Sequence, residues 1–470
     1  MEKNEYQPWA PYISPTPGEI TLLASSPVSY WREEIPESVF KELKECNFNA
    51  TYIICTIGDE KLKENSLRSI INAKAAGINV IARNYFFNLG EPPKKNGIPI
   101  SYEACFVHAK EFYNLFKKVD PNEPLTAGND IIKGWCMKDE PDIDLLTQEP
   151  DANDGYNLRN IVQYMNNDGN TRPIQINLEA YISQDDWDKH INALKEFGLN
   201  LWSYDCYPIT EHSCLLTSCA LQNNCKLDVN YDKFYTQLER YSAMVSSHNK
   251  ESNRRIAFWA YAQTMEHMMA TSTGAFSHYH PAAWDRYLRF EVFSALAFGA
   301  QGIVYWTYNQ REDSGNEVYL SALVNLNGQK MYAWYYAQRV NAEVKKYSHV
   351  FVNSNLEGYW YVKHPSVQTP SQFPKKCPIV SAFIMNMNTR CLVTSLTNAS
   401  SDNYIVIVSG DVENSQDLTL YFSSDAKIKF ITPIKSTGEA ETEFHEPERP
   451  VTLNIVPGGY YIIQYDYESQ

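Results

Sequence analysis

An alternation of eight β-rich apolar runs with segments of helical spacing restricts the fold of this sequence more than any other feature. The eight runs occupy residues 20–26, 50–55, 78–85, 131–137, 173–178, 199–204, 255–261 and 302–307. Helical spacing follows in segments such as 185–197 and 284–298, and Gly198 and Gly299 stand where these two helices would end. Eight successive strand–helix units predict an α/β fold, a (β/α)8 TIM barrel.

The pattern changes after the barrel-like region. Short alternating runs, divided by turns rich in Asn, Ser, Asp and Gly, occupy residues 391–396, 404–408, 418–422 and 459–465. This spacing is typical of a small antiparallel β-sandwich. No Gly/Ser linker precedes it, so we expect the two domains to pack together. The expected organisation is an N-terminal extension (1–18), a catalytic barrel domain (19–350) and an accessory sandwich (351–470).

Charge and hydropathy exclude two classes of partner. The chain has 41 Lys and Arg against 56 Asp and Glu, a formal net charge of −15, which repels nucleic acid and anionic membranes. No apolar run reaches the roughly 18 residues that a membrane span requires. These properties favour a neutral substrate.

The cysteines and the N-terminus leave the compartment open. Cys206, Cys214, Cys219 and Cys225 crowd into one polar stretch with spacing unlike that of a zinc site, and one or two disulfides there would favour an oxidising compartment. A native start at Met1, without a signal peptide, would indicate a cytoplasmic protein, whereas removal of a signal peptide would indicate a periplasmic or extracellular one. We expect no cofactor and no metal, because the sequence has neither a phosphate-binding glycine loop nor a clear set of metal ligands.

The fourth β-rich run ends in two adjacent carboxylates, Asp139 and Glu140, and Pro141 stops it. Charged groups beside a core are costly unless they are paired or used. One interpretation is that the pair begins a solvated loop. The other is that it belongs to a catalytic site, because active sites of TIM barrels lie at the C-terminal ends of the strands.

Other side chains suited to sugar binding are expected at the same rim. They lie at the ends of the third and the fifth to eighth strands, and they are Arg83, Asn84, Tyr85, Asn177, Glu179, Asp205, Tyr207, Trp259, Tyr261, Gln263, Tyr305, Trp306 and Tyr308. Carboxylates serve acid–base chemistry, amides bind hydroxyls, and aromatic rings stack on sugar faces. This composition predicts a carbohydrate site, which the 33 Tyr and 10 Trp of the chain also favour.

Three segments carry a family resemblance. They are Gly134-Trp135 through Asp139-Glu140-Pro141, Ser203-Tyr204-Asp205 followed by Tyr207-Pro208, and Ala295 to Ile303 leading into Tyr305-Trp306. They resemble a group of bacterial glycoside hydrolases with TIM barrels and C-terminal β-domains. The resemblance implies that Glu140 is the general acid/base. It also implies a nucleophilic glutamate at the end of strand 7, where this sequence has Gln263, and the nearest glutamate is Glu266.

Two further interpretations stay open. The Asp139-Glu140 pair also resembles the pair with which some barrel hexosaminidases perform substrate-assisted cleavage; there, Asp139 would orient an N-acetyl group that Tyr207 or Tyr308 could bind. Alternatively, the missing strand 7 glutamate would suit a non-catalytic barrel that only binds glycans. We expect a glycosidase, an O-glycosyl hydrolase acting on a neutral carbohydrate, whose candidate catalytic residues are Glu140, Asp139 and Glu266.

Overall fold

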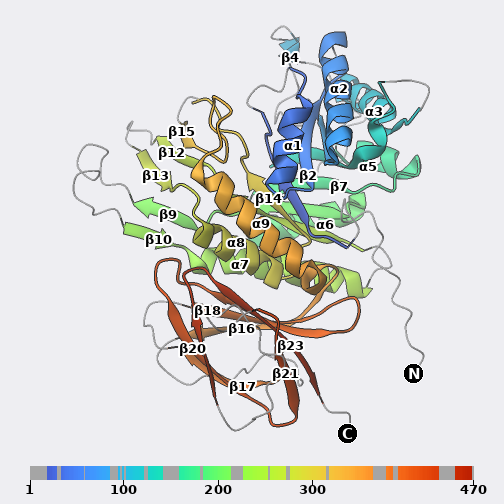
Figure 1. Cartoon of the computed structure of the whole chain (residues 1–470). Helices are drawn as coiled ribbons and strands as arrows, with labels where there is room; N and C mark the ends of the chain where they lie inside the picture. The colour runs from blue at the N-terminus through green and yellow to red at the C-terminus, as the bar shows by residue number, and fades with distance from the viewer. Residues whose placement is uncertain are drawn as a thin grey trace.

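The structure is a computed structural model with two parts, a barrel surrounded by helices and a pair of antiparallel sheets (Figure 1). It describes residues 18–28, 33–57, 59–84, 94–95, 98–99, 102–120, 125–140, 158–179, 184–212, 226–251, 255–270, 276–313, 317–363, 377–384, 390–432 and 450–467. Within these ranges, no helix combines the length and the hydropathy that crossing a bilayer requires.

Eight parallel strands close into a barrel in the order β1-β14-β11-β8-β7-β6-β3-β2. Their bounds are β1 Thr21–Ala24, β2 Ala50–Cys55, β3 Asn79–Asn84, β6 Ile132–Asp139, β7 Ile174–Glu179, β8 Leu201–Asp205, β11 Ala257–Gln263 and β14 Gly302–Trp306. Each run expected from the sequence forms one of these strands, which confirms the (β/α)8 barrel. The strands are almost continuously buried, as strands covered on both faces must be.

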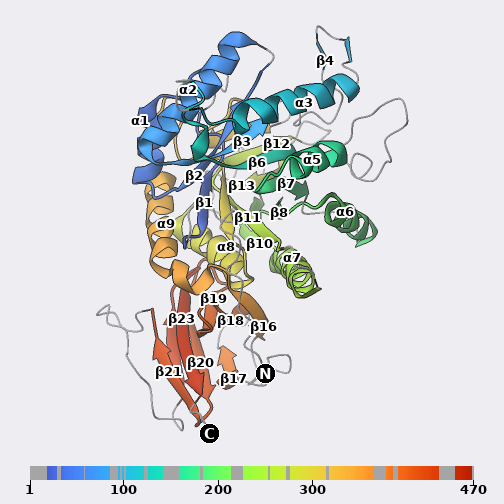
Figure 2. The ribbon, with the colours of Figure 1, turned by 90° about the vertical axis from the view of Figure 1, so that its right-hand side faces the viewer.

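Helices surround the barrel on its outer face (Figure 2). Their bounds are α1 Glu37–Glu45, α2 Glu60–Ala76, α3 Tyr102–Lys117, α5 Leu158–Asn167, α6 Gln184–Phe197, α7 Tyr231–Glu251, α8 Asp285–Ala297 and α9 Tyr332–Phe351, and a 3-10 turn, η2, lies at Asn129–Ile131. Helix α2 shows how the sequence sets its ends. The Asp59 side chain accepts from the Leu62 amide at 2.9 Å, and Gly77 takes the left-handed conformation that ends the helix.

An accessory antiparallel sheet lies beside the barrel and was not expected from the sequence. Its order is β10-β9-β13-β12-β15. The strands are β9 Ile209–His212, β10 Lys226–Val229, β12 Glu266–Ala270, β13 Phe276–His280 and β15 Glu317–Ser321, and a further short hairpin pairs β4 Lys94–Lys95 with β5 Ile98–Pro99. The sheet is built from segments that follow barrel strands β8, β11 and β14, so it extends one side of the C-terminal rim (Figure 1).

Two antiparallel sheets follow α9 and form the predicted C-terminal sandwich. The five-stranded sheet is β16-β18-β19-β23-β21 and the three-stranded sheet is β17-β20-β22. The strands are β16 Asn355–Lys363, β17 Ile379–Ile384, β18 Arg390–Thr397, β19 Asn403–Ser409, β20 Gln416–Phe422, β21 Ala426–Phe430, β22 Val451–Ile455 and β23 Tyr460–Tyr467. Side chains from both sheets, such as Val393, Ile407 and Leu420, share one buried core.

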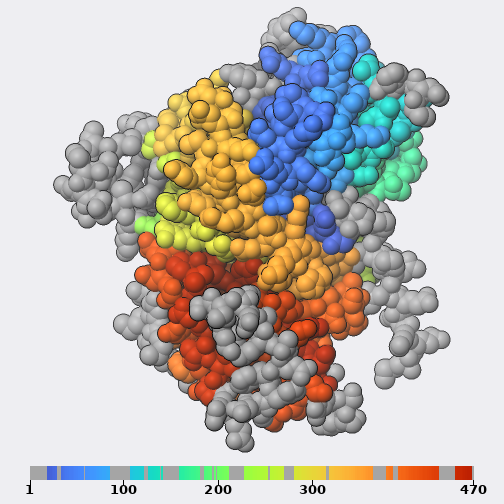
Figure 3. Space-filling model, viewed as in Figure 1, coloured from blue at the N-terminus to red at the C-terminus, as the bar shows by residue number. Residues whose placement is uncertain are grey.

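The sandwich packs directly against the barrel helices (Figure 3). The Phe293 ring of α8 stacks on the Tyr460 ring of β23 with centroids 3.5 Å apart. The Tyr361 hydroxyl of β16 donates to Glu239 of α7 at 2.7 Å. Gly458, at φ 61°, approaches α8 so closely that a Cβ atom there would lie 1.9 Å from the Arg286 carbonyl oxygen. The interface therefore has the close packing that the missing linker predicts.

Candidate active site

A cavity of about 390 Å³ opens at the C-terminal ends of the barrel strands. Six of the residues expected at the rim line it, namely Arg83, Asp139, Asn177, Asp205, Tyr261 and Trp306. They come from six different strands, so the closed barrel brings together side chains that are far apart in the sequence. Tyr52 of β2 also lines the cavity, and on the side of β1 the lining is polar, with Ser25, Ser26 and Asn309.

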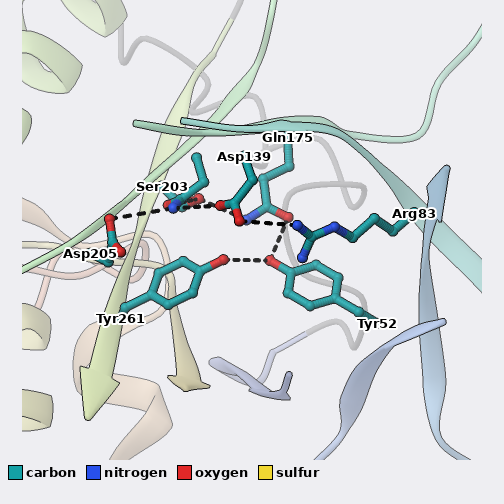
Figure 4. Close-up of polar contacts among 8 residues, drawn as sticks. Tyr52, Arg83, Asp139, Gln175, Ser203, Asp205 and Tyr261 are labelled. Atoms are coloured by element: carbon teal, nitrogen blue, oxygen red, sulfur yellow. Dashed lines mark hydrogen bonds and ion pairs between the residues drawn. The ribbon is translucent and has the colours of Figure 1, made fainter. Parts of the chain in front are cut away.

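Asp139 is held by two donors on neighbouring strands (Figure 4). Arg83 lies 3.1 Å from its Oδ2 atom and forms an ion pair with it. The Asn177 side-chain nitrogen donates to its Oδ1 atom at 3.0 Å. The Arg83 side chain is mostly buried, so this guanidinium is neutralised by Asp139 and is not an open anion-binding group.

Asp205 and Glu140 form a second carboxyl pair. The charge of Glu140 acts on Asp205, and the Asn177 side-chain nitrogen donates to the Asp205 Oδ1 atom at 3.5 Å. Burial raises the pKa of Asp205 well above its usual range, and the charges of Glu140 and Asp139 raise it further. The pKa of Glu140 is also raised, so both carboxyl groups favour the protonated form more than free acids do.

Glu140 follows the cavity-lining Asp139 directly after β6 and has an unusual backbone conformation. Its φ of 43° is left-handed, which is uncommon for a residue other than glycine, and its amide donates to the Asn177 carbonyl at 2.9 Å. The residue as a whole is exposed, but its carboxyl is partly withdrawn from water. This desolvation raises the pKa of Glu140, and the charges of Asp139 and Glu179 raise it further. A raised pKa suits a carboxyl that must carry a proton at neutral pH.

The seventh strand contributes no carboxylate to the cavity. Gln263 is buried, and its side chain donates to the Met265 carbonyl at 3.1 Å. Glu266 begins β12 of the accessory sheet, where its Oε2 atom accepts from Ser321 at 2.7 Å, and it does not line the cavity. The structure therefore does not bring Glu266 together with Glu140 and Asp205, which corrects its placement among the catalytic candidates.

Glu291, a carboxyl buried behind strand 7, was missed in the sequence analysis. It lies on α8, is 3% exposed, and accepts from the Gln263 amide at 2.8 Å. Burial raises its pKa to about 8, so Glu291 is largely protonated at neutral pH. Its only sequence signal is a glutamate among apolar residues on a helix that faces the barrel.

The predicted aromatic residues divide into two groups. Tyr261 and Trp306 line the cavity, and Tyr207 stacks on Trp306 with centroids 5.6 Å apart. In contrast, Trp259, Tyr305 and Tyr308 belong to the core, so the prediction that they contact substrate is corrected. Trp259 packs against Gly302 inside the barrel, while the hydroxyls of Tyr305 and Tyr308 bond to Asn341 and Trp334 of α9.

The remaining rim predictions have mixed outcomes. Asn84 is buried and does not line the cavity, whereas Glu179 is exposed at the end of β7 and acts on Glu140 through its charge. Tyr85 lies outside the described residues, as do Cys214, Cys219 and Cys225, the expected disulfide partners of Cys206. Three interior polar residues were missed, namely Tyr52, Gln175 and Ser203. A polar side chain within an apolar barrel strand was the signal that could have identified them.

The fold and the rim together define a TIM barrel with a C-terminal β-sandwich and a carboxyl cluster at the barrel mouth. No family model and no curated protein matches the chain. Among solved structures, a catalytic mutant of a GH42 β-galactosidase from G. stearothermophilus is similar, with a TM-score of 0.52 and 8% identity over 95% of this chain and 98% of that one.

Two other solved structures are less similar in three dimensions. A β-galactosidase from the psychrophilic Marinomonas ef1 has a TM-score of 0.44 and 13% identity, and the match covers 69% of this chain and 60% of that chain. A glycoside hydrolase family 5 mannosidase from Rhizomucor miehei has a TM-score of 0.44 and 10% identity, over 71% of this chain and 95% of that one. At 8% identity, the likeness to the GH42 β-galactosidase shows a shared fold alone.

Proposed function

We propose that this protein is a glycoside hydrolase acting on a neutral carbohydrate, with Glu140 as general acid/base and Asp205 as its partner. The observation that carries the proposal is the placement of Glu140 and Asp205 at the C-terminal ends of β6 and β8, on either side of β7. Glycosidases of the common mechanisms use two carboxyls that flank the scissile bond. The solved glycosidases of similar architecture support the proposal at the level of the fold.

We propose a retaining mechanism for this pair. Inverting enzymes separate their carboxyls by roughly 6.5–9.5 Å to admit a water molecule, whereas retaining enzymes need only about 5–5.5 Å. The charge of Glu140 acts on Asp205, as expected of near neighbours, which supports the second class. In the reaction Glu140 carries a proton to the leaving oxygen, while Asp205, which must first lose the proton that its raised pKa favours, attacks or stabilises the positive charge that develops on the sugar.

The cavity walls suit an uncharged, hydroxyl-rich ligand. Arg83 is paired with Asp139, and the lining holds four acidic side chains against two basic ones, Arg83 and Arg311, so it disfavours an anionic ligand. The aromatic faces of Tyr261 and Trp306 offer apolar contact, and Asn177 with the serines of the β1 side offers hydrogen bonds. These features support a sugar in preference to a phosphorylated or carboxylated compound.

The two alternative functions receive unequal support. In the substrate-assisted mechanism, Asp139 must orient an acetamide, but both of its oxygens already bind other side chains, Oδ2 to Arg83 and Oδ1 to Asn177. A glycan-binding barrel without catalysis is favoured by one observation, the lack of a cavity-lining carboxylate on β11. Activity measurements separate this alternative from the proposed glycosidase.

The decisive experiment replaces Glu140 by Gln and measures hydrolysis of 4-nitrophenyl glycosides and the matching alkyl glycosides of galactose, mannose and arabinose. We expect kcat/KM to fall about 10²–10⁴-fold, with the larger loss on alkyl glycosides, because a poor leaving group depends more on protonation. Glu179→Gln is the matched control, since Glu179 is a nearby exposed glutamate at the same rim, and it should lose less than 10-fold. A wild-type protein that binds these sugars but cleaves none of them would refute the glycosidase.

A further inference from the structure

A continuous hydrogen-bond chain runs through the barrel interior beneath the cavity and ends at the acids (Figure 4). Its links are Tyr261 to Tyr52 (3.4 Å between hydroxyls), Tyr52 to Gln175 Oε1 (2.8 Å), Gln175 Nε2 to Ser203 Oγ (2.8 Å), Ser203 to Asn177 Oδ1 (2.9 Å), and Asn177 Nδ2 to Asp139 (3.0 Å) and Asp205 (3.5 Å). It connects strands β11, β2, β7, β8 and β6. Gln175 and Ser203 are fully buried and do not line the cavity.

The charge of Asp139 sets the direction of the first half of this chain. Asp139 forms an ion pair with Arg83 and accepts from Asn177, so the Asn177 amide turns its nitrogen toward that carboxylate and its oxygen toward Ser203. The Ser203 hydroxyl then donates to the Asn177 oxygen at 2.9 Å, a shorter contact than the 3.4 Å to its other acceptor, the Ile176 carbonyl. Having used its single proton, the Ser203 oxygen accepts from Gln175.

The same logic continues to the far end of the chain. With its nitrogen committed to Ser203, Gln175 faces Tyr52 with its oxygen, so the Tyr52 hydroxyl donates to Gln175. Tyr52 then has only a lone pair for its neighbour, and Tyr261 must donate to Tyr52. The proton of the Tyr261 hydroxyl therefore points away from the cavity, and its oxygen lone pairs remain for a ligand.

We propose that Gln175 and Ser203 are positioning residues of the acid cluster, and that the chain they complete makes Tyr261 an acceptor for a sugar hydroxyl. The inference rests on the proposed function for its catalytic meaning. The two residues touch no substrate, but Ser203 donates to the Asn177 oxygen and so holds the amide with its nitrogen against Asp139 and Asp205. Without this support, the Asn177 nitrogen would be held less firmly against the two carboxyl groups.

The test follows the titration of Asp205 by ¹³C NMR of labelled aspartate carboxyls, assigned with Asp205→Asn, in the wild type and in Ser203→Ala. The groups that act on the Asp205 titration are Glu140 and Asp139, and Tyr207 and Tyr241 also feel its charge; the substitution changes none of them. The hydrogen bond from Asn177 lowers the pKa of Asp205. Weakening that bond in Ser203→Ala should therefore raise the pKa of Asp205 by about half a unit or more.

Thr51→Val is the matched control. Thr51 is an equally buried barrel hydroxyl that donates to the Ala24 carbonyl at 2.8 Å outside the chain, so its loss should leave the titration unchanged. Gln175→Glu keeps the side-chain shape but cannot donate to Ser203, and it should shift the titration in the same direction. If Ser203→Ala and Thr51→Val give equal titrations, the proposal is overturned. Because this readout needs no turnover, it fails or succeeds separately from the glycosidase assay.

Discussion

The two halves of the barrel mouth treat their carboxyl groups in opposite ways. On the β6–β8 half, the carboxylates lie in the cavity wall, where Asp139 is ion-paired with Arg83 and Asp205 is near the Asn177 amide. On the β11–β14 half, Tyr261 and Trp306 line the cavity from the strands, Arg311 and Glu312 line it from the segment after β14, and the carboxyl of Glu291 lies behind β11. In the first half, side-chain donors contact the carboxyl groups, whereas Glu291 accepts from a backbone amide.

The difference shows that location within the barrel decides the charge state of an acid. A carboxyl that receives a guanidinium and an amide can remain ionised near the surface, whereas one with a single amide partner in the interior stays protonated. Glu291 therefore shapes the end of strand 7 through its hydrogen bond to Gln263 without supplying a nucleophile. We expect the β6–β8 half to supply the catalytic acids and the β11–β14 half to support the end of strand 7. The following experiments test this division.

The largest effect is expected for Asp205→Asn on the β6–β8 half. Removing the partner of Glu140 should lower kcat/KM on a cleaved aryl glycoside by about 10³-fold or more, because the developing positive charge loses its anion. If Asp205 is the nucleophile, azide added to Asp205→Ala should form a glycosyl azide of inverted configuration, detectable by NMR. If kcat/KM of Asp205→Asn stays within 10-fold of the wild-type value, Asp205 is not the partner of Glu140 and the proposed division is wrong.

A stability effect is expected for Glu291→Gln on the β11–β14 half. The pKa of Glu291 is raised to about 8 in the folded chain from about 4.3 when unfolded, so its stabilising contribution is complete below pH 4 and is lost as pH rises through 8. Gln keeps the acceptor for Gln263 and cannot ionise. At pH 8.5 we expect its Tm to exceed the wild-type value by about 2–5 °C, with little difference at pH 4.5.

Glu60→Gln is the control for that comparison, since Glu60 is an exposed acid on α2 and its loss changes the net charge equally. In thermal unfolding between pH 4.5 and 8.5, the Tm difference between the control and the wild type should not grow with pH. A Glu291→Gln variant with a constant Tm difference at every pH would show that Glu291 does not titrate as a buried acid.

The smallest effect is expected for Tyr261→Phe, which removes one hydroxyl from the β11–β14 half. The loss of an acceptor for one sugar hydroxyl should lower kcat/KM about 5- to 20-fold. Against a series of monodeoxy aryl glycosides, the wild type and the variant should become equal for the one sugar that lacks the contacted hydroxyl. A variant that instead discriminates among the deoxy sugars as the wild type does would show that Tyr261 contacts none of these hydroxyls.

The fold was predictable because its signal is local and repeated. Each β-rich run had to be buried on both faces, and the helix-ending glycines fixed the spacing, so eight barrel strands could be recognised one at a time. The accessory sheet was missed because its strands, such as β12 and β15, are short and pair across long stretches of sequence. Only the folded barrel brings them together.

The site was partly predictable for a related reason. Position at a strand end correctly placed Asp139, Asn177 and Asp205 at the cavity, since strand ends meet at one rim. Position at a strand end did not show which side chains face the cavity. Because side chains alternate along a strand, Tyr305 turns outward to α9 while Trp306 turns inward. Partners separated by a hundred residues, such as Tyr52 and Gln175, give no sequence signal of their contact.

Helix α8 has a consequence for the modularity of this architecture. One of its faces holds Glu291 against the end of strand 7, and two residues later Phe293 stacks on Tyr460 of the sandwich. The same helix therefore supports the end of strand 7 and carries a contact with the sandwich. We expect that a different sandwich would fit this barrel only if the α8 surface that faces it matched.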